Sequence, residues 1–407
     1  MKIKGSYNDV DVLLKNEDLD DATRSQIQEL ANNPRYAENK IVMMPDTHAG
    51  IPAPIGLTMQ IEHDLVKFPF ELVGNDIGCG VTSIIFNTDR PFTEYELSLA
   101  YREIEEEIQT TVNETNIAED FVRDTGSKFE IYESLNCGTI PEYEWRTFGT
   151  LGGGNHFIEL GEISKNTYML SVHSGSRGLG AFVYKKYKEI AQKGSEKNAK
   201  NKRQEIIDFF LERGLDTMIE DVIKNVPSEY FDTDGYLNGL DVIDYLGDMD
   251  YAVEFAEQSR TSILLRVYVI LSMIQSTYSK QTIISTHNYY NQRDGILRKG
   301  AVRSDGLLVT PLSMNKGIIV SEGIPSADNN YSAPHGAGRV MSRKVAKETI
   351  TLESLKDDME GIMTNVREGI IDESPRAYKD YDKLVDEFAK TMKPIAIAKP
   401  ILNFKGE

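Results

Sequence analysis

The stretch Gly74-Asn75-Asp76-Ile77-Gly78-Cys79-Gly80 lies between two apolar runs, residues 68–73 and 81–86. We expect these runs to be strands joined by a tight turn, because glycine adopts backbone torsions that other residues resist. Asp76 and Cys79 project from this turn, three residues apart. A carboxylate and a thiol on one rigid turn suit a divalent metal, provided that imidazoles reach them from elsewhere in the chain.

Four of the six histidines lie in similar settings. His156 follows three glycines and Asn155, His173 and His287 each end an apolar run, and His335 lies in a glycine-rich segment. Scaffolds commonly present functional side chains at strand ends beside small residues. One such histidine is weak evidence, but four in a chain with so few histidines indicate a shared site.

The order of elements along the 407 residues predicts the fold class. Short strands dominate before residue 182 and after residue 280, and helices dominate between them. We therefore expect an α+β fold, a single large mixed-sheet domain over residues 1–407 with an inserted helical subdomain at about 182–280. Helices are expected at about 20–32, 93–135, 182–192 (ending at Gly194), 204–212, 250–275 and 352–366, strands at 282–286, 295–302, 307–309 and 317–320, and a polar turn at 44–50. The apolar C-terminal run is expected to pack inward and to bring Lys405 to the site.

Composition indicates the cellular compartment and the kinds of binding partner that we expect. Two cysteines argue against a disulfide framework, the N-terminus lacks an apolar signal segment, and the most apolar helical stretch, residues 263–271, is short and contains Arg266. We therefore expect a cytoplasmic protein. The net charge is −19, but residues 185–203 hold eight basic and two acidic side chains. Such a segment can bind phosphates beside a site, although a solvated helix face is the simpler explanation of the segment alone.

Asp76, Cys79, His156, His173 and His287 form a mixed set of nitrogen, oxygen and sulfur donors. This set fits Mn²⁺, Zn²⁺, Fe²⁺ or Co²⁺, and five ligands are enough for two ions bridged by the thiolate. The alternative is a closed structural zinc site. Structural sites usually have four ligands at short local spacings, whereas these are spread over residues 76–287.

His335 differs from the other three because cationic residues lie near it in the sequence. Arg339 follows four residues later, and Lys299 and Arg303 precede it. A neutral imidazole beside a metal-bound phosphate can attack phosphorus, and cations then stabilise the transferring group. The alternative is a histidine hydrogen-bonded within its loop. Asp46 and, in the same segment, His48 are candidates for positioning ligands or water, although a turn held by the Asp46 side chain is equally consistent.

Seven motifs together resemble the RtcB family of RNA ligases, in the family's order and over nearly the whole chain. They are Met-Pro-Asp-x-His-x-Gly at 44–50, Gly-Asn-Asp-Ile-Gly-Cys-Gly at 74–80, Gly-Gly-Gly-Asn-His-Phe-Ile-Glu at 152–159, His-Ser-Gly-Ser-Arg-Gly at 173–178, Thr-His-Asn at 286–288, Arg-Lys-Gly-Ala at 298–301 and His-Gly-Ala-Gly-Arg at 335–339. The resemblance implies an RtcB-like catalytic domain. It also implies an enzyme that uses GTP and Mn²⁺, with two ions expected, to join RNA 2′,3′-cyclic phosphate or 3′-phosphate ends to 5′-hydroxyl ends in RNA repair or tRNA splicing.

The resemblance also assigns roles to residues. The five donors would bind manganese, and His335 would attack the α-phosphorus of GTP, become guanylylated and pass GMP to the RNA 3′-phosphate. The 5′-hydroxyl would then displace GMP from the RNA(3′)pp(5′)G intermediate. The other implied residues are Asn155, Asn288, Ser313, Ala337 and Gly338 at the nucleotide and its phosphates, Glu159, Tyr378 and Lys405 at guanine, and Arg177, Arg339 and Lys299 at the reacting phosphates. An activating protein partner similar to archease is a further implication.

One motif departs from the family. Leu312-Ser313-Met314-Asn315 stands where the family usually has Gly-Ser-Met-Gly, which bears on nucleotide preference. Two rival functions are a metal-dependent RNA-end phosphatase or cyclic phosphodiesterase that does not ligate, and a non-catalytic RNA-binding protein with a structural metal. His63, between two acidic residues, is expected to be merely exposed.

Overall fold

A six-stranded sheet draws its strands from two distant parts of the chain. The computed structural model describes residues 1–61, 68–112, 117–213, 215–225 and 236–406, and His63 lies outside them. The strand order is β1 (Lys2–Lys4), β2 (Asp9–Val12), β3 (Ile41–His48), β4 (Ile55–Gln60), β12 (Ile296–Lys299) and β11 (Asn288–Asn291). Only β2 and β3 pair in parallel. The sheet therefore joins residues 41–60 to residues 288–299.

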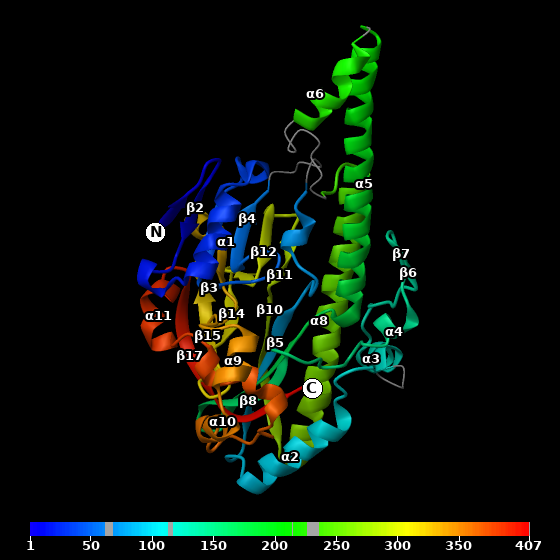
Figure 1. Ribbon diagram of the computed structural model, residues 1–407. Helices are drawn as coiled ribbons and strands as arrows, with labels where there is room; N and C mark the ends of the chain where they lie inside the picture. The colour runs from blue at the N-terminus through cyan, green and yellow to red at the C-terminus, as the bar shows by residue number, and fades with distance from the viewer. Residues whose placement is uncertain (62–67, 113–116, 214, 226–235, 407) are drawn as a thin grey trace.

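A seven-stranded antiparallel sheet forms the second layer of the body (Figure 1). Its order is β10 (Thr277–Thr286), β5 (Gly80–Thr88), β9 (Thr167–Ser174), β8 (Phe157–Ser164), β17 (Met392–Lys405), β15 (Ile318–Gly323) and β14 (Leu307–Pro311). The sheet curls so that its two edge strands approach one another, and Val309 N on β14 donates a hydrogen bond to Ser285 Oγ on β10 at 3.1 Å. Two small ribbons, β13 (Ala301–Arg303) with β16 (Ser332–Pro334) and β6 (Ser134–Leu135) with β7 (Gly138–Thr139), complete the described strands.

Helices cover these sheets, and one of them extends well beyond the body (Figure 1). The described α-helices are α1 (Asp21–Ala31), α2 (Glu94–Glu107), α3 (Ile117–Thr125), α4 (Glu142–Trp145), α5 (Arg177–Leu211), α6 (Ile219–Asn225), α8 (Leu240–Ile274), α9 (Arg343–Thr349), α10 (Leu352–Asp358) and α11 (Tyr381–Phe388). Short 3-10 helices include η3 (Phe70–Leu72), η4 (Asp216–Met218), η6 (Glu368–Glu373) and η7 (Pro375–Ala377). None of the helices in the described ranges is long and apolar enough to cross a membrane.

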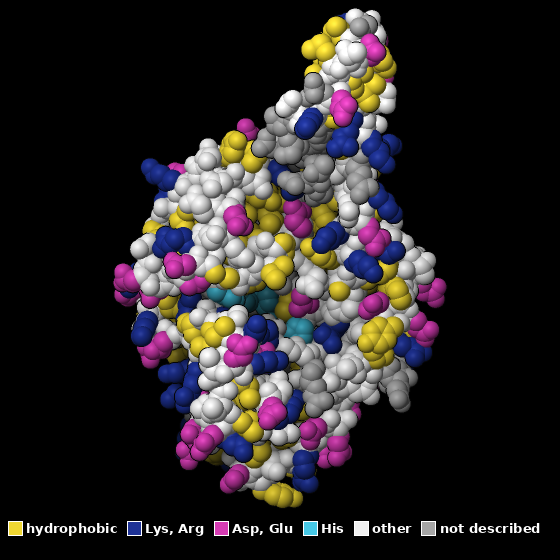
Figure 2. All heavy atoms as spheres, in the orientation of Figure 1, with side chains coloured by type: hydrophobic (Ala, Val, Ile, Leu, Met, Phe, Trp, Pro, Cys, Tyr) yellow, Lys and Arg dark blue, Asp and Glu magenta, His cyan; other side chains and the backbone are white. Residues whose placement is uncertain are grey.

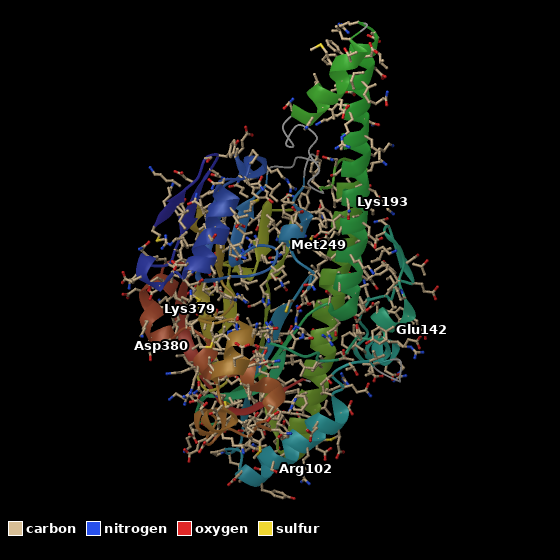
Figure 3. The ribbon with its side chains drawn as sticks, in the orientation of Figure 1. Arg102, Glu142, Lys193, Met249, Lys379 and Asp380 are labelled. Carbon is tan, nitrogen blue, oxygen red and sulfur yellow. The ribbon has the colours of Figure 1, made fainter. Side chains whose placement is uncertain are left out.

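Helix α8 joins the two main parts of the hydrophobic core. Its first half, including Tyr245 and Met249, packs into the cluster that contains the six-stranded sheet. Its second half, including Ile263 and Val267, packs against the seven-stranded sheet and α2. Figure 3 shows Met249 at the centre of the molecule, between the first sheet and α5. One continuous helix thus ties both sheets together by burying apolar side chains along its length.

The mixed α+β class is confirmed, and several element boundaries are wrong. Residues 68–73 contain the 3-10 helix η3 rather than a strand. Residues 44–48 belong to β3 rather than to a turn, and α5 continues through Gly194. Helix α2 ends at Glu107 and α10 ends at Asp358, earlier than expected. The described part of residues 182–280 is largely helical, and its division from the rest as an inserted subdomain stays a prediction.

Candidate metal centre and active site

Strand register brings the candidate metal ligands to one end of the seven-stranded sheet. Gly80, directly after Cys79, pairs with both Ser174 on β9 and Thr286 on β10. His173 therefore lies beside the turn from one side, and His287, which follows β10, lies beside it from the other. His156 immediately precedes β8, which pairs with β9. Neighbouring strands that end together gather residues that are distant in sequence.

The five donors fall into two groups that share one thiol. Sγ of Cys79 lies 3.3 Å from Nε2 of His173 and 3.6 Å from Nε2 of His156. Nε2 of His156 is 3.2 Å from Oδ2 of Asp76, and Nε2 of His173 is 3.4 Å from Nε2 of His287. The donor atoms of Cys79, His173 and His287 lie within 4.8 Å of one another, and so do those of Asp76, Cys79 and His156. The structure thus brings the whole predicted ligand set together.

Burial keeps the imidazoles of His173 and His287 in the neutral form that can bind a cation. It lowers the pKa of His173 and of His287 well below 6.5, so both rings are neutral at pH 7. Nδ1 of His173 lies 3.1 Å from the carbonyl oxygen of Asn155. A carbonyl only accepts, so Nδ1 carries the proton and Nε2 presents its lone pair to Cys79 and His287. A lone pair on Nε2 of His173, 3.4 Å from Nε2 of His287, fits a metal ion between the two rings.

The pKa values of Asp76 and Cys79 shift in opposite directions in this environment. Burial would raise the pKa of Asp76, but its hydrogen bond to His156 and the adjacent imidazole charge outweigh burial and lower it. Burial and the nearby Asp76 charge raise the pKa of the Cys79 thiol well above its usual value. A metal ion would reverse this effect, because a coordinating thiol loses its proton. The donor set is therefore complete only with a bound cation.

Arg260 on α8 holds the segments that carry these ligands, and sequence reasoning missed it. Its buried guanidinium donates to the carbonyl oxygen of Gly78 at 2.7 Å and to that of Ser174 at 2.9 Å. It also contacts the hydroxyl of Thr286, next to His287, at 3.5 Å. The available signal was its helical spacing, because Arg260 lies four residues from both Ala256 and Leu264 and so shares their buried face.

His335 stands beside this cluster, held by a carboxylate. Its ring centroid is 4.7 Å from that of His287. Oδ2 of Asp46 lies 2.7 Å from Nδ1 of His335 and accepts from the backbone N–H groups of His335 and Gly336 at 3.1 Å. Nδ1 therefore carries the proton, and Nε2 presents a lone pair. Asp46 was expected in a turn near the metal ligands; it instead orients His335, while its carbonyl contacts Nδ1 of His48.

These groups open into one cavity of about 730 Å³. Figure 2 shows the histidines at the bottom of a hollow in the molecular surface. All the residues assigned to the site by resemblance line it except His156 and Arg177. Those that do are Asp76, Cys79, Asn155, Glu159, His173, His287, Asn288, Lys299, Ser313, His335, Ala337, Gly338, Arg339, Tyr378 and Lys405. His156 lies behind the lining, on Asp76 and Cys79.

One wall of the cavity carries buried polar atoms that lack a hydrogen-bond partner among the described residues. Glu159 on β8 accepts from Nδ2 of Asn403 on β17 at 2.9 Å. Its Oε1 atom and Oδ1 of Asn403 are buried without a partner among the described residues. Burial raises the pKa of Glu159 to about 8, against the opposing effects of Asn403 and Lys405. These two unpartnered polar atoms favour a ligand that forms hydrogen bonds with them.

Glu373 organises the rest of this wall, and no sequence pattern singled it out. Its Oε2 atom accepts from Tyr378 Oη at 2.7 Å and from Lys405 Nζ at 3.0 Å. Its Oε1 atom faces Arg343 at 2.6 Å and Arg339 at 3.4 Å. Burial would raise its pKa, but the surrounding cations lower it. The Glu373 carboxylate thus positions four side chains at the cavity wall, which are those of Arg339, Arg343, Tyr378 and Lys405.

The remaining predicted residues lie at the edges of the site. Lys299 Nζ donates to the carbonyl oxygen of Ile51 at 2.9 Å, and burial lowers its pKa to about 8. Arg177 begins α5 and donates to the carbonyl oxygen of Thr110 at 3.0 Å. Ser313 lies in a turn closed by Asn315, whose side chain also contacts the carbonyl oxygen of Asp358. Asn315 therefore gives the unusual 312–315 motif a structural role.

Comparisons with known proteins identify the family of this chain. The model of the family described as tRNA-splicing ligase RtcB matches residues 26–406. The chain is 27% identical to RNA-splicing ligase RtcB of Escherichia coli K12, with 94% of each chain covered. It is 24% identical to tRNA-splicing ligase RtcB of Aeropyrum pernix, with 88% of this chain and 87% of that one covered. The protein is an RNA ligase by descent, and the chain belongs to the RtcB family.

Proposed function

We propose that this ligase joins RNA 2′,3′-cyclic phosphate or 3′-phosphate ends to 5′-hydroxyl ends, using GTP and a guanylylated His335. The observation that carries the proposal is the position of His335. Its Nδ1 atom is held by Asp46, and its ring lies against the metal-ligand cluster at the bottom of a cavity large enough for a nucleotide. An imidazole that is held in this way at the wall of a cavity can act as a nucleophile.

The first step is transfer of GMP to the protein. Nε2 of His335 attacks the α-phosphorus of GTP, a phosphorus–nitrogen bond forms, and the bond to the β-phosphate oxygen breaks to release pyrophosphate. Asp46 accepts the Nδ1 hydrogen bond and stabilises the positive charge that develops on the ring. Lys299 and Arg339 line the same cavity and can balance the negative charge of the transferring phosphoryl group.

The two donor groups around Cys79 would hold two manganese ions. Cys79, His173 and His287 form one group, and Asp76, Cys79 and His156 form the other. Bound there, the metal would supply positive charge that polarises phosphate oxygens. The mixed nitrogen, oxygen and sulfur set admits Mn²⁺ without selecting it over Zn²⁺, Fe²⁺ or Co²⁺.

The polar wall of the cavity supports a preference for guanine. Guanine presents N–H donors on its base-pairing edge, and these would pair with the unpartnered oxygens of Asn403 and of Glu159 in its ionised form. Tyr378 lines the cavity with its hydroxyl fixed by Glu373, so its ring can stack on a base. Lys405, fixed by the same carboxylate, can donate to a base oxygen. Asn155, Asn288, Ser313, Ala337 and Gly338 also line the cavity and would contact the sugar or phosphates.

The later steps use the RNA ends. At a 2′,3′-cyclic end, water first adds to phosphorus and the bond to O2′ breaks, which leaves a 3′-phosphate. A 3′-phosphate oxygen then attacks the phosphorus bound to His335, which releases the imidazole and gives RNA(3′)pp(5′)G. The 5′-hydroxyl then attacks the RNA 3′-phosphorus, and GMP leaves. Arg177 and Arg339 would hold the RNA phosphates. The names of the relatives, which refer to RNA splicing and tRNA splicing, support RNA repair or tRNA splicing as the role. An activating protein similar to archease stays a prediction.

The direct test uses two RNA fragments with defined ends, one with a 3′-phosphate and one with a 5′-hydroxyl, together with GTP and Mn²⁺. A joined product that needs both GTP and Mn²⁺ supports the proposal. Loss of the terminal phosphate without joining would instead assign the cavity to an RNA-end phosphatase or cyclic phosphodiesterase. RNA binding without any reaction would instead indicate a non-catalytic RNA-binding protein.

A further inference from the structure

Helix α5 links the active site to a surface far from it. Its first residue, Arg177, lies close to the metal-ligand cluster, because its guanidinium and Nδ1 of His156 both lie against Gly152. The helix has 35 residues, so it extends about 50 Å at 1.5 Å per residue. Its later part rises beyond the sheets, accompanied by η4 and α6 (Figure 1). We call residues 185–213 the arm.

The arm carries a row of basic side chains. Lys186, Lys193, Lys197 and Lys200 follow one another at intervals of seven, four and three residues, which places them on one face of the helix. Lys193, Lys197 and Lys200 are exposed, and none of these three forms an ion pair with any residue that the structure describes. Lys186 packs against the ring of Phe182, with Nζ 5.6 Å from the ring centroid. Three ammonium groups are therefore available to a partner.

The charge of the arm contrasts with that of the whole protein. The chain has a net charge of −19, yet residues 185–203 contain eight basic and two acidic side chains. Figure 2 shows dark blue side chains along the arm on the same face of the molecule that opens onto the histidines. Figure 3 places Lys193 about midway along α5. A polyanion that enters the cavity from this face can therefore lie along the arm as well.

We propose that the arm binds the phosphate backbone of a double-stranded region next to the broken ends, so that the preferred substrate is a structured RNA rather than a pair of short single strands. This inference rests on the proposed ligase function. Lysine contacts to phosphates fix the position of a nucleic acid without reading its sequence. Proteins that bind single strands usually add aromatic side chains for base stacking. No aromatic residue lies between Lys193 and Lys200, and of the aromatic residues in the arm, Tyr187 is buried, while Phe209 and Phe210 lie near the far end of α5. Recognition along the arm is therefore by backbone charge, as expected for duplex RNA.

The test compares two substrates with identical ends. One is a stem-loop RNA broken in its loop, and the other is a pair of short single strands with the same terminal sequences. The arm variant is Lys193→Glu/Lys197→Glu/Lys200→Glu, with the corresponding Gln variant to limit disturbance of the helix. The control is Lys4→Glu/Lys165→Glu/Lys393→Glu, which makes the same charge change at exposed positions on β1, on the turn between β8 and β9, and on β17. Circular dichroism checks that helix content is kept in every variant.

We expect the arm variant to raise KM for the stem-loop about tenfold or more at physiological salt, and to change KM for the short strands less than about twofold. The slope of log affinity for the stem-loop against log salt should fall by about one for each lost phosphate contact. An unchanged KM for the stem-loop, an equal rise for both substrates, or the same rise in the control would overturn the inference. If the wild-type protein joins neither RNA, the ligase proposal fails, and binding of the stem-loop to the wild type and the arm variant still decides the role of the arm.

Discussion

Oδ2 of Asp46 lies 2.7 Å from Nδ1 of His335, and this carboxylate has no exposed surface. The same oxygen accepts from two backbone N–H groups, at His335 and Gly336. The loop that contains His335 and the His335 ring itself are thus held by one oxygen atom. The contact links β3 near the N-terminus to a loop almost 290 residues later, and it determines which ring nitrogen is available for reaction.

Removing the charge of Asp46 should slow guanylylation. In Asp46→Asn the ring loses its anionic acceptor, so both its tautomer and its developing positive charge lose support. We expect the rate of His335 labelling to fall about 100-fold or more, with GTP affinity changed less than about threefold. Single-turnover labelling with radioactive GTP measures both quantities.

Asp20→Asn is the matched control, because Asp20 also lines the cavity and Asn keeps the helix cap that Asp20 provides to Thr23. Its labelling rate should stay within about threefold of the wild-type rate. Equal losses in both variants would show that Asp46 acts only through the general charge of the cavity.

The shared thiol makes a stoichiometric prediction about metal binding. Cys79 belongs to both donor groups, whereas His287 and Asp76 each belong to one. Cys79→Ala should therefore lose both manganese ions, and His287→Ala or Asp76→Ala should each keep one. Inductively coupled plasma mass spectrometry on protein dialysed against Mn²⁺ gives the number of ions per chain. An unchanged manganese content in Cys79→Ala would refute the ligand assignment.

Arg260 should control metal affinity from outside the ligand set. In Arg260→Met the buried carbonyl groups of Gly78 and Ser174 lose their donor, and the segments that they anchor can move. We expect Mn²⁺ affinity to fall about tenfold or more and the free energy of unfolding to fall by about 3 kcal/mol. Arg266→Met on the same helix is the control, because Arg266 contacts Glu107 and the carbonyl oxygen of Gly149 rather than Gly78 or Ser174. Equal metal affinities in the two variants would contradict this role.

The raised pKa of Glu159 predicts how stability depends on pH. Between its unfolded value of 4.5 and about 8, folded Glu159 keeps a proton that the unfolded chain has lost. The contribution of Glu159 to stability therefore falls as pH rises through this window. Glu159→Gln should match the wild type near pH 4.5, then exceed it by about 1.4 kcal/mol per pH unit, levelling off above about pH 8.

Urea unfolding of metal-free protein at pH 5, 7 and 8.5 measures this difference. The exposed Glu103→Gln variant is the control, and its free energy of unfolding should stay within about 0.5 kcal/mol of the wild-type value at each pH. A Glu159→Gln difference that stays constant or shrinks as pH rises would show that Glu159 is ionised in the folded protein.

Much of the site could be predicted from the sequence because its chemistry is local in each motif. Cys79 lies between two apolar runs, and His173 and His287 each end an apolar run. Strand pairing then gathers the three residues at one end of the seven-stranded sheet. Arg260 and Glu373 could not be assigned roles in the same way. Their importance comes from the segments that they contact, and those contacts exist only once the two sheets and α8 are packed together.

The errors in the fold have similar physical causes. Strand β3 is buried over residues 41–47, so it lacks the alternation that would have identified its polar end as a strand. The apolar run at 68–73 contains helix η3, and apolar content alone does not distinguish a short helix from a strand. Gly194 does not end α5, because a single glycine costs a helix only about 1 kcal/mol relative to alanine.

The most direct measurement of the central claim is the site of guanylate attachment. The protein is incubated with GTP labelled at the α-phosphate and Mn²⁺, without RNA, and the labelled peptide is mapped. We expect an acid-labile label on His335 that RNA with a 3′-phosphate removes, and none in His335→Ala. Label on another residue, or label that persists in His335→Ala, would contradict the assignment of His335 as the nucleophile.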